Sequence, residues 1–211
     1  MGRWEPNTRA RLEQAAGELY IERGFEQTTV AEIAERAGTT ERTFFRHFAD
    51  KREVLFGGAG ALQELIVNAV MNAPDSASSV KAVAAGLEAA GAAFGDNTER
   101  VRQRQAIIAA NPELQARELS KLAGLASAIA DALRQRGVAD PAAILTAEAG
   151  IVVFRVAFER WINATRQRGW SRLVHETLGE LRTLMEGERR AHSKSVSVDA
   201  RASKSAGSNK R

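Results

Sequence analysis

The sequence predicts an all-α protein of about nine helices. Helix start signals recur along the chain, strand-like alternation of apolar and polar residues is absent, and aromatic residues make up only 6% of the sequence. Glycines fall where several helical segments end, as expected for residues that adopt the left-handed conformation easily. The expected helices span residues 8–23, 29–37, 40–47, 50–72, 78–95, 97–110, 112–136, 141–168 and 171–187.

The first three helices predict a small helix-turn-helix unit. Gly24 ends the first helix, and Thr29 with Glu32 forms a capping box that begins the second. Gly38 supplies the left-handed residue that a tight corner needs before the third helix. The apolar residues expected to face one another are Leu12, Ala16, Leu19, Phe25, Val30, Ile33, Ala37, Phe44 and Phe48. They can close a three-helix core within a domain at residues 1–55.

The later helices also begin at capping residues. Asp50 and Asp96 each precede a glutamate three residues on, whereas Asn111 and Asp140 are each followed by proline, which suits the first helical position. These signals continue without a break in composition. They predict a second helical domain over residues 56–188.

Three glycines lie inside the expected helix at residues 50–72, namely Gly57, Gly58 and Gly60. Each glycine costs about 1 kcal/mol relative to alanine in a helix interior. The three glycines therefore indicate either close packing against another helix or a flexible joint. The sequence leaves both explanations open.

The net charge of +4 comes from the end of the chain. Residues 1–56 hold nine Lys/Arg and ten Asp/Glu, residues 57–186 hold 14 of each, and residues 187–211 hold seven and two. The segment 189–211 is rich in Ser, Ala and Lys without apolar periodicity, and it predicts a disordered basic tail. Such a tail either keeps the protein soluble or contacts DNA electrostatically. Evidence for DNA binding must therefore come from particular residues.

The third helix carries cations and an aromatic residue opposite its core residues. If Phe44 and Phe48 are buried, then Arg42, Phe45 and Arg46 face outward. A helix-turn-helix presents the start of its second helix to base edges in the major groove, where arginine can form a bidentate pair with guanine. The alternative is a solvated helix face with incidental arginines.

The run AAGELYIERGFEQTTVAEIAERAGTTERTFFRHFADKREVL resembles the DNA-binding domain of TetR-family transcriptional regulators over about residues 8–55. The shared features are Leu-Tyr, Gly-Phe, Thr-Thr-Val, Ala-Gly, Thr-Phe-Phe and His-Phe. The resemblance implies DNA-backbone contacts from Thr28, Thr29, Phe45, His47 and Lys51, and base contacts from Thr40, Arg42 and Thr43. It also implies double-stranded DNA with a palindromic operator as the partner of a homodimer.

The resemblance further implies a C-terminal helical domain that binds a small molecule. Alanine and glycine are frequent within residues 78–136, which either leaves space for a ligand or lets helices approach closely. The candidate ligand-binding residues are Phe94, Val101, Arg104, Gln105, Ile108, Leu125, Ile129 and Phe158. The run VRQRQAIIAANPELQARELSKL resembles regulators associated with acyl-coenzyme A or fatty-acid ligands. Arg102 and Arg104 are thus candidates for an anionic headgroup, with plain solvation as the alternative.

The last two helices are expected to form the dimer interface. The segment from Gly150 to Phe158 is apolar on nearly all sides, which is unusual for a surface helix of a monomer. The candidate interface residues are Ile151, Phe154, Leu173, Thr177, Leu178, Leu181 and Leu184. Deep burial within one subunit is the alternative.

The sequence argues against an enzyme and against a metal or other cofactor. There is no cysteine, and the three histidines, His47, His175 and His192, lack metal-ligand spacing. The N-terminus lacks the apolar segment of a signal peptide, and no uninterrupted run reaches the roughly 18 apolar residues of a membrane span. We therefore expect a cytoplasmic protein without a membrane partner.

The predicted function is that of a ligand-responsive transcriptional regulator. The resemblance favours a repressor that binds a palindromic operator as a dimer and is released by a small apolar or acyl-type effector. The alternative is a DNA-binding protein of the same fold that is regulated by a protein partner, for example in nucleoid occlusion. A closed apolar cavity would favour the first function, and an exposed partner surface would favour the second.

Overall fold

The computed structural model describes residues 8–94, 98–164 and 169–187. All regular elements in these ranges are helical, which confirms the all-α prediction. They are α1 (Thr8–Arg23), α2 (Val30–Arg36), α3 (Glu41–His47), the 3-10 helix η1 (Glu53–Phe56), α4 (Ala59–Met71), α5 (Ser79–Ala89), α6 (Gly91–Phe94), α7 (Thr98–Ala109), α8 (Pro112–Gln135), α9 (Ala142–Asn163) and a last helix over residues 170–187. The predicted tail at 189–211 lies outside the described residues.

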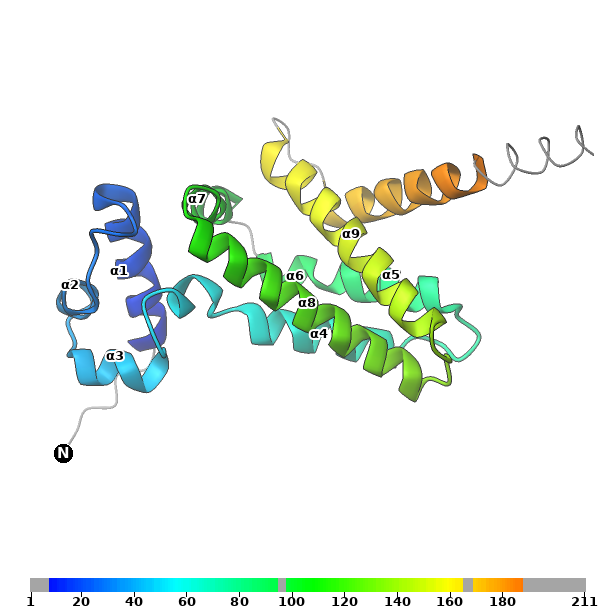
Figure 1. The fold of residues 1–211 in the computed structure, drawn as a ribbon, viewed down its shortest axis with the longest axis horizontal. Helices are drawn as coiled ribbons and strands as arrows, with labels where there is room; N and C mark the ends of the chain where they lie inside the picture. Colours follow the sequence, from blue (N-terminus) through cyan, green and yellow to red (C-terminus); the bar gives the residue numbers. More distant parts are fainter. Residues whose placement is uncertain (1–7, 95–97, 165–168, 188–211) are drawn as a thin grey trace, which may run out of the picture.

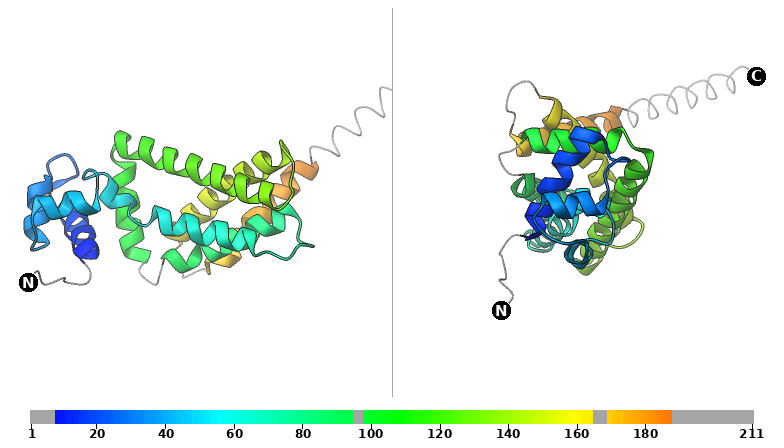
Figure 2. Two further views of the ribbon diagram at one scale, coloured as in Figure 1. Left: turned by 90° about the horizontal axis from the view of Figure 1, so that it is seen from below. Right: turned by 90° about the vertical axis from the view of Figure 1, so that its left-hand side faces the viewer.

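The helices form two groups along an elongated molecule (Figure 1). In this view α1, α2 and α3 gather at one end, whereas α4, α5, α8 and α9 form a bundle in the other part. Figure 2 shows the same separation after a quarter turn about the long axis. The connection runs through η1, and α1 packs against both η1 and α7. The recognition elements are therefore attached to the bundle at more than one point.

The first hydrophobic cluster confirms the core predicted for the first three helices. Each predicted residue is buried in it, apart from Val30, which is partly buried against it. The cluster also contains Ile108 of α7 and Leu114 of α8, and both side chains are fully buried. Because these two residues belong to the predicted second domain, the two groups of helices share a continuous apolar contact.

The second hydrophobic cluster lies among α4, α5, α8, α9 and the last helix. Its fully buried large side chains are Ile66, Val70, Leu87, Ile129, Leu133 and Leu173. An added Cβ would lie 2.8 Å from a Val70 methyl at Gly86 and 2.6 Å from a Val83 methyl at Gly150. At these two positions glycine serves close helix packing.

The expected continuous helix at residues 50–72 is interrupted in the structure. η1 and α4 are separate elements, and Gly58 stands at the N-cap of α4. A Cβ at Gly57 would lie 2.4 Å from the Glu13 carboxylate of α1, whereas a Cβ at Gly58 meets no atom within 4 Å. The atom nearest to Gly57 is the end of a flexible side chain that can shift, and packing does not explain Gly58.

The expected helix at residues 78–95 divides into α5 and α6. The Trp170 ring lies at the break, where a Cβ on Gly91 would be 2.7 Å from the indole. The Trp170 indole N–H donates to the carbonyl of Leu87 at 2.6 Å. In a continuous helix that carbonyl would serve the amide four residues on. The last helix therefore donates a hydrogen bond to a carbonyl near the end of α5.

One described stretch, Glu53–Met71, is long and apolar enough to cross a membrane by length and composition alone. The count of uninterrupted apolar residues missed it because charged and polar residues are interspersed. Ile66 and Val70 of this stretch lie fully buried in the second cluster. In the structure the stretch is part of the helical bundle.

Candidate nucleic-acid interface

Two phenylalanines anchor the inner face of α3. Thr40 is the N-cap, and its hydroxyl accepts a hydrogen bond from the Thr43 amide at 3.2 Å. The Thr40 and Thr43 hydroxyls lie 3.1 Å apart, within hydrogen-bond distance. Phe44 is fully buried, Phe48 is 4% exposed, and their ring centroids are 5.5 Å apart. This apolar pair fixes which face of the helix points outward, as the sequence predicted.

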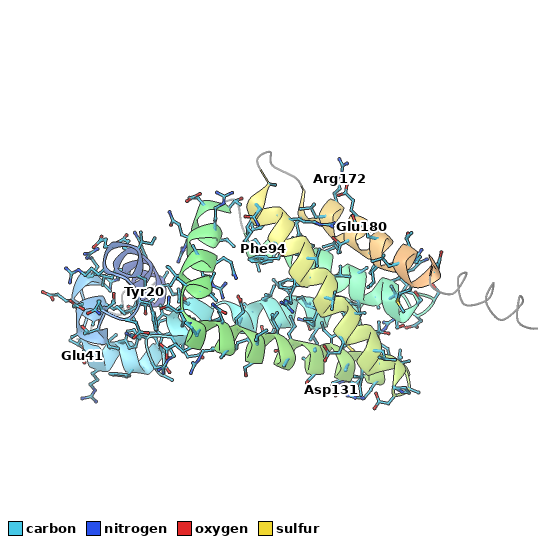
Figure 3. All side chains as sticks on the ribbon, turned by 45° about the horizontal axis from the view of Figure 1, so that its top comes forward. Tyr20, Glu41, Phe94, Asp131, Arg172 and Glu180 are labelled. Carbon is cyan, nitrogen blue, oxygen red and sulfur yellow. The ribbon has the colours of Figure 1, made fainter. Side chains whose placement is uncertain are left out.

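The outward face of α3 carries Arg42, Phe45 and Arg46. Phe45 is 55% exposed and contacts Phe44 edge to face, with 5.5 Å between ring centroids. Arg42 and Arg46 are exposed, and neither forms a hydrogen bond or ion pair with another described residue. Figure 3 shows Glu41, the first residue of α3, near one end of the long axis. Two guanidinium groups are thus available to an anionic partner.

Thr29 and His47 flank this face. The Thr29 amide and hydroxyl donate to the Glu32 carboxylate at 2.8 and 2.9 Å, and the Glu32 amide donates back to the hydroxyl, which confirms the predicted capping box. The Thr29 amide, followed by its hydroxyl, lowers the pKa of Glu32 from its ordinary value. The Nε2 atom of the half-buried His47 is enclosed without a hydrogen-bond partner in the described part of the chain.

Two of the predicted backbone contacts have side chains that are already engaged within the protein. Thr28 is 1% exposed, and its hydroxyl donates to the Gly24 carbonyl at 2.8 Å. The Lys51 ammonium donates to the carbonyls of Phe25, Glu26 and Thr28 at 2.9, 3.1 and 3.0 Å, and lies 4.5 Å from the Phe25 ring centroid. An ammonium has three donors, so none is left for a phosphate in this conformation. Lys51 instead ties the α1–α2 turn together.

Tyr20, which is not among the predicted site residues, completes this turn. Its hydroxyl donates to the Lys51 carbonyl at 2.6 Å, and its ring meets Phe25 edge to face at 5.2 Å. Burial, reinforced by the nearby Asp50 carboxylate, raises the pKa of Tyr20 above its ordinary value. The hydroxyl therefore stays neutral and keeps donating. A buried tyrosine hydroxyl usually has a hydrogen-bond partner. A tyrosine on the core face of α1 could therefore have indicated this contact.

The predicted ligand residue Arg104 lies where the two groups of helices meet. Its Nε donates to the Leu55 carbonyl at 2.6 Å, and its guanidinium lies 5.1 Å from the Phe56 ring centroid. It also pairs with Glu118 of α8 at 3.7 Å. Burial lowers the pKa of Arg104, and Glu118 opposes this shift. The side chain joins η1, α7 and α8 and is not a free cation for a ligand headgroup.

Three neighbouring candidates on α7 are also engaged. Gln105 donates to Glu118 at 3.3 Å, although its amide oxygen is buried without a partner among the described residues. Ile108 lies in the first hydrophobic cluster, next to the recognition helices. Arg102 donates to the Ile162 carbonyl at 2.9 Å and holds the end of α9.

The other ligand candidates gather in the second cluster. Leu125 and Ile129 are buried there, and Phe94, Val101 and Phe158 pack against it while partly exposed. The structure adds three rings that the sequence did not group with them, namely Phe154, Trp161 and Trp170. Figure 3 labels Phe94 in this region, between α7 and α9 in that view. The ring centroids of Phe94 lie 4.8–6.2 Å from those of its four aromatic neighbours.

The predicted interface residues divide into an inner and an outer set. Four are buried within the subunit, namely Ile151, Phe154, Leu173 and Thr177. Leu178 and Leu181 are half-buried, and Leu184 is 69% exposed. Leu145 and Val152 of α9 and Met185 of the last helix are also exposed apolar residues, at 65, 50 and 63% exposed. An apolar run in the sequence predicts that a helix is buried. It does not show which side of the helix packs within the subunit and which side faces a partner.

Known proteins resemble this chain in both groups of helices. The family described as "Bacterial regulatory proteins, tetR family" matches residues 13–56, and the family described as "MftR C-terminal domain" matches residues 77–186. The HTH-type transcriptional regulator TcmR of Streptomyces glaucescens is 38% identical over 82 residues, which are 39% of this chain and 36% of TcmR. The match therefore spans about a third of that relative.

A second relative and a solved structure extend the match. The putative mycofactocin biosynthesis transcriptional regulator MftR of Mycobacterium tuberculosis (strain ATCC 25618 / H37Rv) is 29% identical over 136 residues, 64% of this chain and 69% of MftR. The crystal structure of Thermus thermophilus FadR, a TetR-family transcriptional repressor in complex with lauroyl-CoA, has a TM-score of 0.51 and 23% identity, covering 85% of this chain and 94% of that one. This similarity supports the fold assignment of the chain.

These matches agree with the geometry of α3. They support the predicted DNA-binding regulator and bear out the expectation that the chain is not an enzyme. The exposed arginines stand on the second helix of a matched helix-turn-helix, and a matched regulator domain follows. This chain belongs to the TetR family of bacterial transcriptional regulators, and its C-terminal domain is of the MftR type.

Proposed function

We propose that this chain is a homodimeric transcriptional repressor that binds a two-fold-symmetric operator through α3. The outward face of α3 carries this proposal, because Arg42 and Arg46 are exposed and unpaired there among the described residues. Arg42 lies in the first turn, which suits base edges, with Thr40 and Thr43 beside it. Arg46 lies one turn further on and suits a phosphate. Phe45, Thr29 and His47 are the proposed neighbours of the DNA backbone.

A palindromic operator requires two copies of α3 about 34 Å apart. Exposed apolar side chains on α9 and the last helix support a dimer through these elements, since they need cover. The proposed outer contacts are Leu145, Val152, Leu178, Leu181, Leu184 and Met185. The buried Ile151, Phe154, Leu173 and Thr177 support these helices from within.

The proposed effector is a small apolar or acyl-type molecule. Its support is the group of partly exposed apolar residues Phe94, Val101 and Phe158 at the edge of the second cluster. Thermus thermophilus FadR, which shares the fold, was crystallised with lauroyl-CoA. The proposed place of action is the cytoplasm, where the DNA is.

The test combines selection of DNA with native mass spectrometry. The wild-type protein selects duplexes from a randomised library, and the selected duplex is then titrated with lauroyl-CoA. We expect an inverted repeat, an even number of protein copies per duplex, and release on addition of lauroyl-CoA. Selection without any inverted repeat would contradict the dimeric operator. Release by an unrelated co-purified molecule would replace the acyl-type effector and leave the DNA part standing.

A further inference from the structure

The start of α8 reaches the loop that follows the recognition helix. Arg117 of α8 bonds to Asp50 at 3.2 Å and also to Glu53, and Lys121 bonds to Glu53 at 3.1 Å. One turn earlier on α8, Glu113 bonds to Arg52 at 2.8 Å. We call Asp50, Arg52, Glu53, Glu113, Arg117 and Lys121 the interdomain ion cluster.

Asp50 is the member that touches the backbone next to α3. Its carboxylate accepts hydrogen bonds from the amides of Arg52 at 2.8 Å and Glu53 at 3.0 Å, and so begins η1. It follows closely on Phe48, the C-cap of α3. Burial alone would raise the pKa of Asp50, but these amides and the Arg117 guanidinium bring the pKa below its ordinary value. The carboxylate is therefore charged, and Arg117 neutralises it.

The ion cluster faces a cleft that continues to the recognition helix. The cleft has a volume of about 750 Å³, and Asp50, Glu53 and Arg117 share its lining with His47 and Phe48 of α3. The apolar contact through Ile108 and Leu114 attaches the recognition helices but is non-directional. The bonds of Arg117 are directional, because a guanidinium presents its donors in a fixed plane. They can therefore set an orientation that apolar contact leaves free.

We propose that Arg117 is a positioning residue for DNA recognition, which acts through Asp50 to hold α3 at the angle that the operator requires. Arg117 belongs to α8, and its ion pairs with Asp50 and Glu53 cross between the two groups of helices. In this role it acts through these carboxylates and does not touch DNA. A second consequence follows from charge. Loss of Arg117 removes a cation that Asp50 and Glu53 share and leaves them only Arg52 and Lys121, and the added negative charge beside α3 repels phosphates. The proposal rests on the proposed function, because it presupposes that α3 reads DNA.

The first experiment compares Arg117→Met with Arg117→Lys and Arg134→Met. Arg134 is the matched control, since it also lies on α8 and pairs with Asp131 and Asp140, at the opposite end of that helix. The probe is the duplex selected by the wild-type protein, and fluorescence anisotropy gives its affinity beside that of a random duplex. Arg117→Met should weaken binding to the selected duplex by roughly 3- to 30-fold, the range over which remote residues modulate coupled sites. The random duplex should lose less affinity.

Arg117→Lys should recover only part of the affinity, because an ammonium supplies the charge without the fixed plane of donors, and Arg134→Met should change nothing. Thermal unfolding of each variant is measured alongside. Equal affinity losses for the selected and random duplexes, or equal losses in Arg117→Met and Arg134→Met, would overturn the positioning role. If the wild-type protein selects no duplex at all, the proposed function fails and not the positioning role alone.

A double-mutant cycle tests whether Arg117 acts through Asp50. Asp50→Asn keeps a side-chain oxygen that can cap η1 while it removes the charge. In that background Arg117→Met should cost clearly less affinity for the selected duplex than it does alone. Affinity losses that multiply independently would show that Arg117 acts elsewhere and would overturn the proposal.

Discussion

The arginines on α3 and the arginines between the two groups of helices carry the same charge in opposite settings. Arg42 and Arg46 are exposed and have no partner among the described residues. Arg52 and Arg117 each pair with carboxylates across the interface between the groups. A paired cation must lose its partner before it binds a phosphate, whereas an unpaired cation loses only water and counterions. Pairing, more than total charge, therefore marks the cations available to DNA.

The largest expected effect tests the apolar contact beneath the ion pairs. Leu114→Ala should lower the free energy of unfolding by about 2–5 kcal/mol, since Leu114 is fully buried and its loss leaves a cavity. Leu119→Ala is the control on the same helix, because Leu119 is 56% exposed and should change stability little. Chemical denaturation of both variants measures the difference. Similar losses of unfolding free energy in the two variants would mean that Leu114 does not attach the recognition helices to α8.

Lys51 sharpens the comparison, because it is a cation near α3 that the structure uses internally. Lys51→Met should lower the free energy of unfolding by about 1.5–3 kcal/mol, the range for a charge-assisted hydrogen-bond site. Lys121→Met, which removes a half-exposed ion pair, should cost at most about 1 kcal/mol. Thermal unfolding of both variants provides the measurement. If Lys51→Met is as stable as the wild-type protein but binds every duplex more weakly, then Lys51 is a phosphate contact and not a structural residue.

Arg42 provides the opposite case. Arg42→Ala should weaken binding to the selected operator by about 1–3 kcal/mol, the value of a bidentate base contact, and should leave thermal stability unchanged. Binding to random DNA should fall less. Titration of the variant with both duplexes checks this. Equal losses on both duplexes would make Arg42 a phosphate contact without a part in base reading.

The smallest expected effect concerns the joint between η1 and α4. Gly58→Ala should raise stability by about 0.4–1 kcal/mol, because Gly58 has negative φ and open space around a Cβ. If Gly58 is a flexible joint, the variant should still bind operator but need more effector for release. Thermal unfolding and effector titration are the measurements. Lower stability with an unchanged effector response would argue against a joint.

Local patterns predicted the recognition unit well. Phe44 and Phe48 were assigned to the core and Arg42 and Phe45 to the outer face because helical periodicity alone separates them. The same periodicity does not indicate the partners of Lys51, whose three carbonyl acceptors lie in a turn far away in the sequence. Periodicity records which side of a helix is buried but not which distant backbone meets a side chain.

The second group of helices was predicted less completely, because its contacts depend on tertiary packing. Ile108 is a predicted ligand residue, and in the structure its side chain is buried in the hydrophobic cluster of the recognition helices. Arg104 is a predicted cation for a ligand headgroup, and in the structure its Nε donates a hydrogen bond to the Leu55 carbonyl. Leu87 and Gly91, beside the break between α5 and α6, meet Trp170, which lies far along the chain. None of these pairings leaves a local pattern in the sequence.

The most direct test of the central claim is the salt dependence of operator binding by two arginine variants. Arg46→Ala removes an unpaired cation of α3, and Arg52→Ala removes a cation paired with Glu113. We predict that the slope of log affinity against log salt falls by about 0.9 in Arg46→Ala, the contribution of one neutralised phosphate, and stays unchanged in Arg52→Ala. Equal changes in the two slopes, or a change in Arg52→Ala alone, would contradict the claim that pairing decides which cations meet DNA.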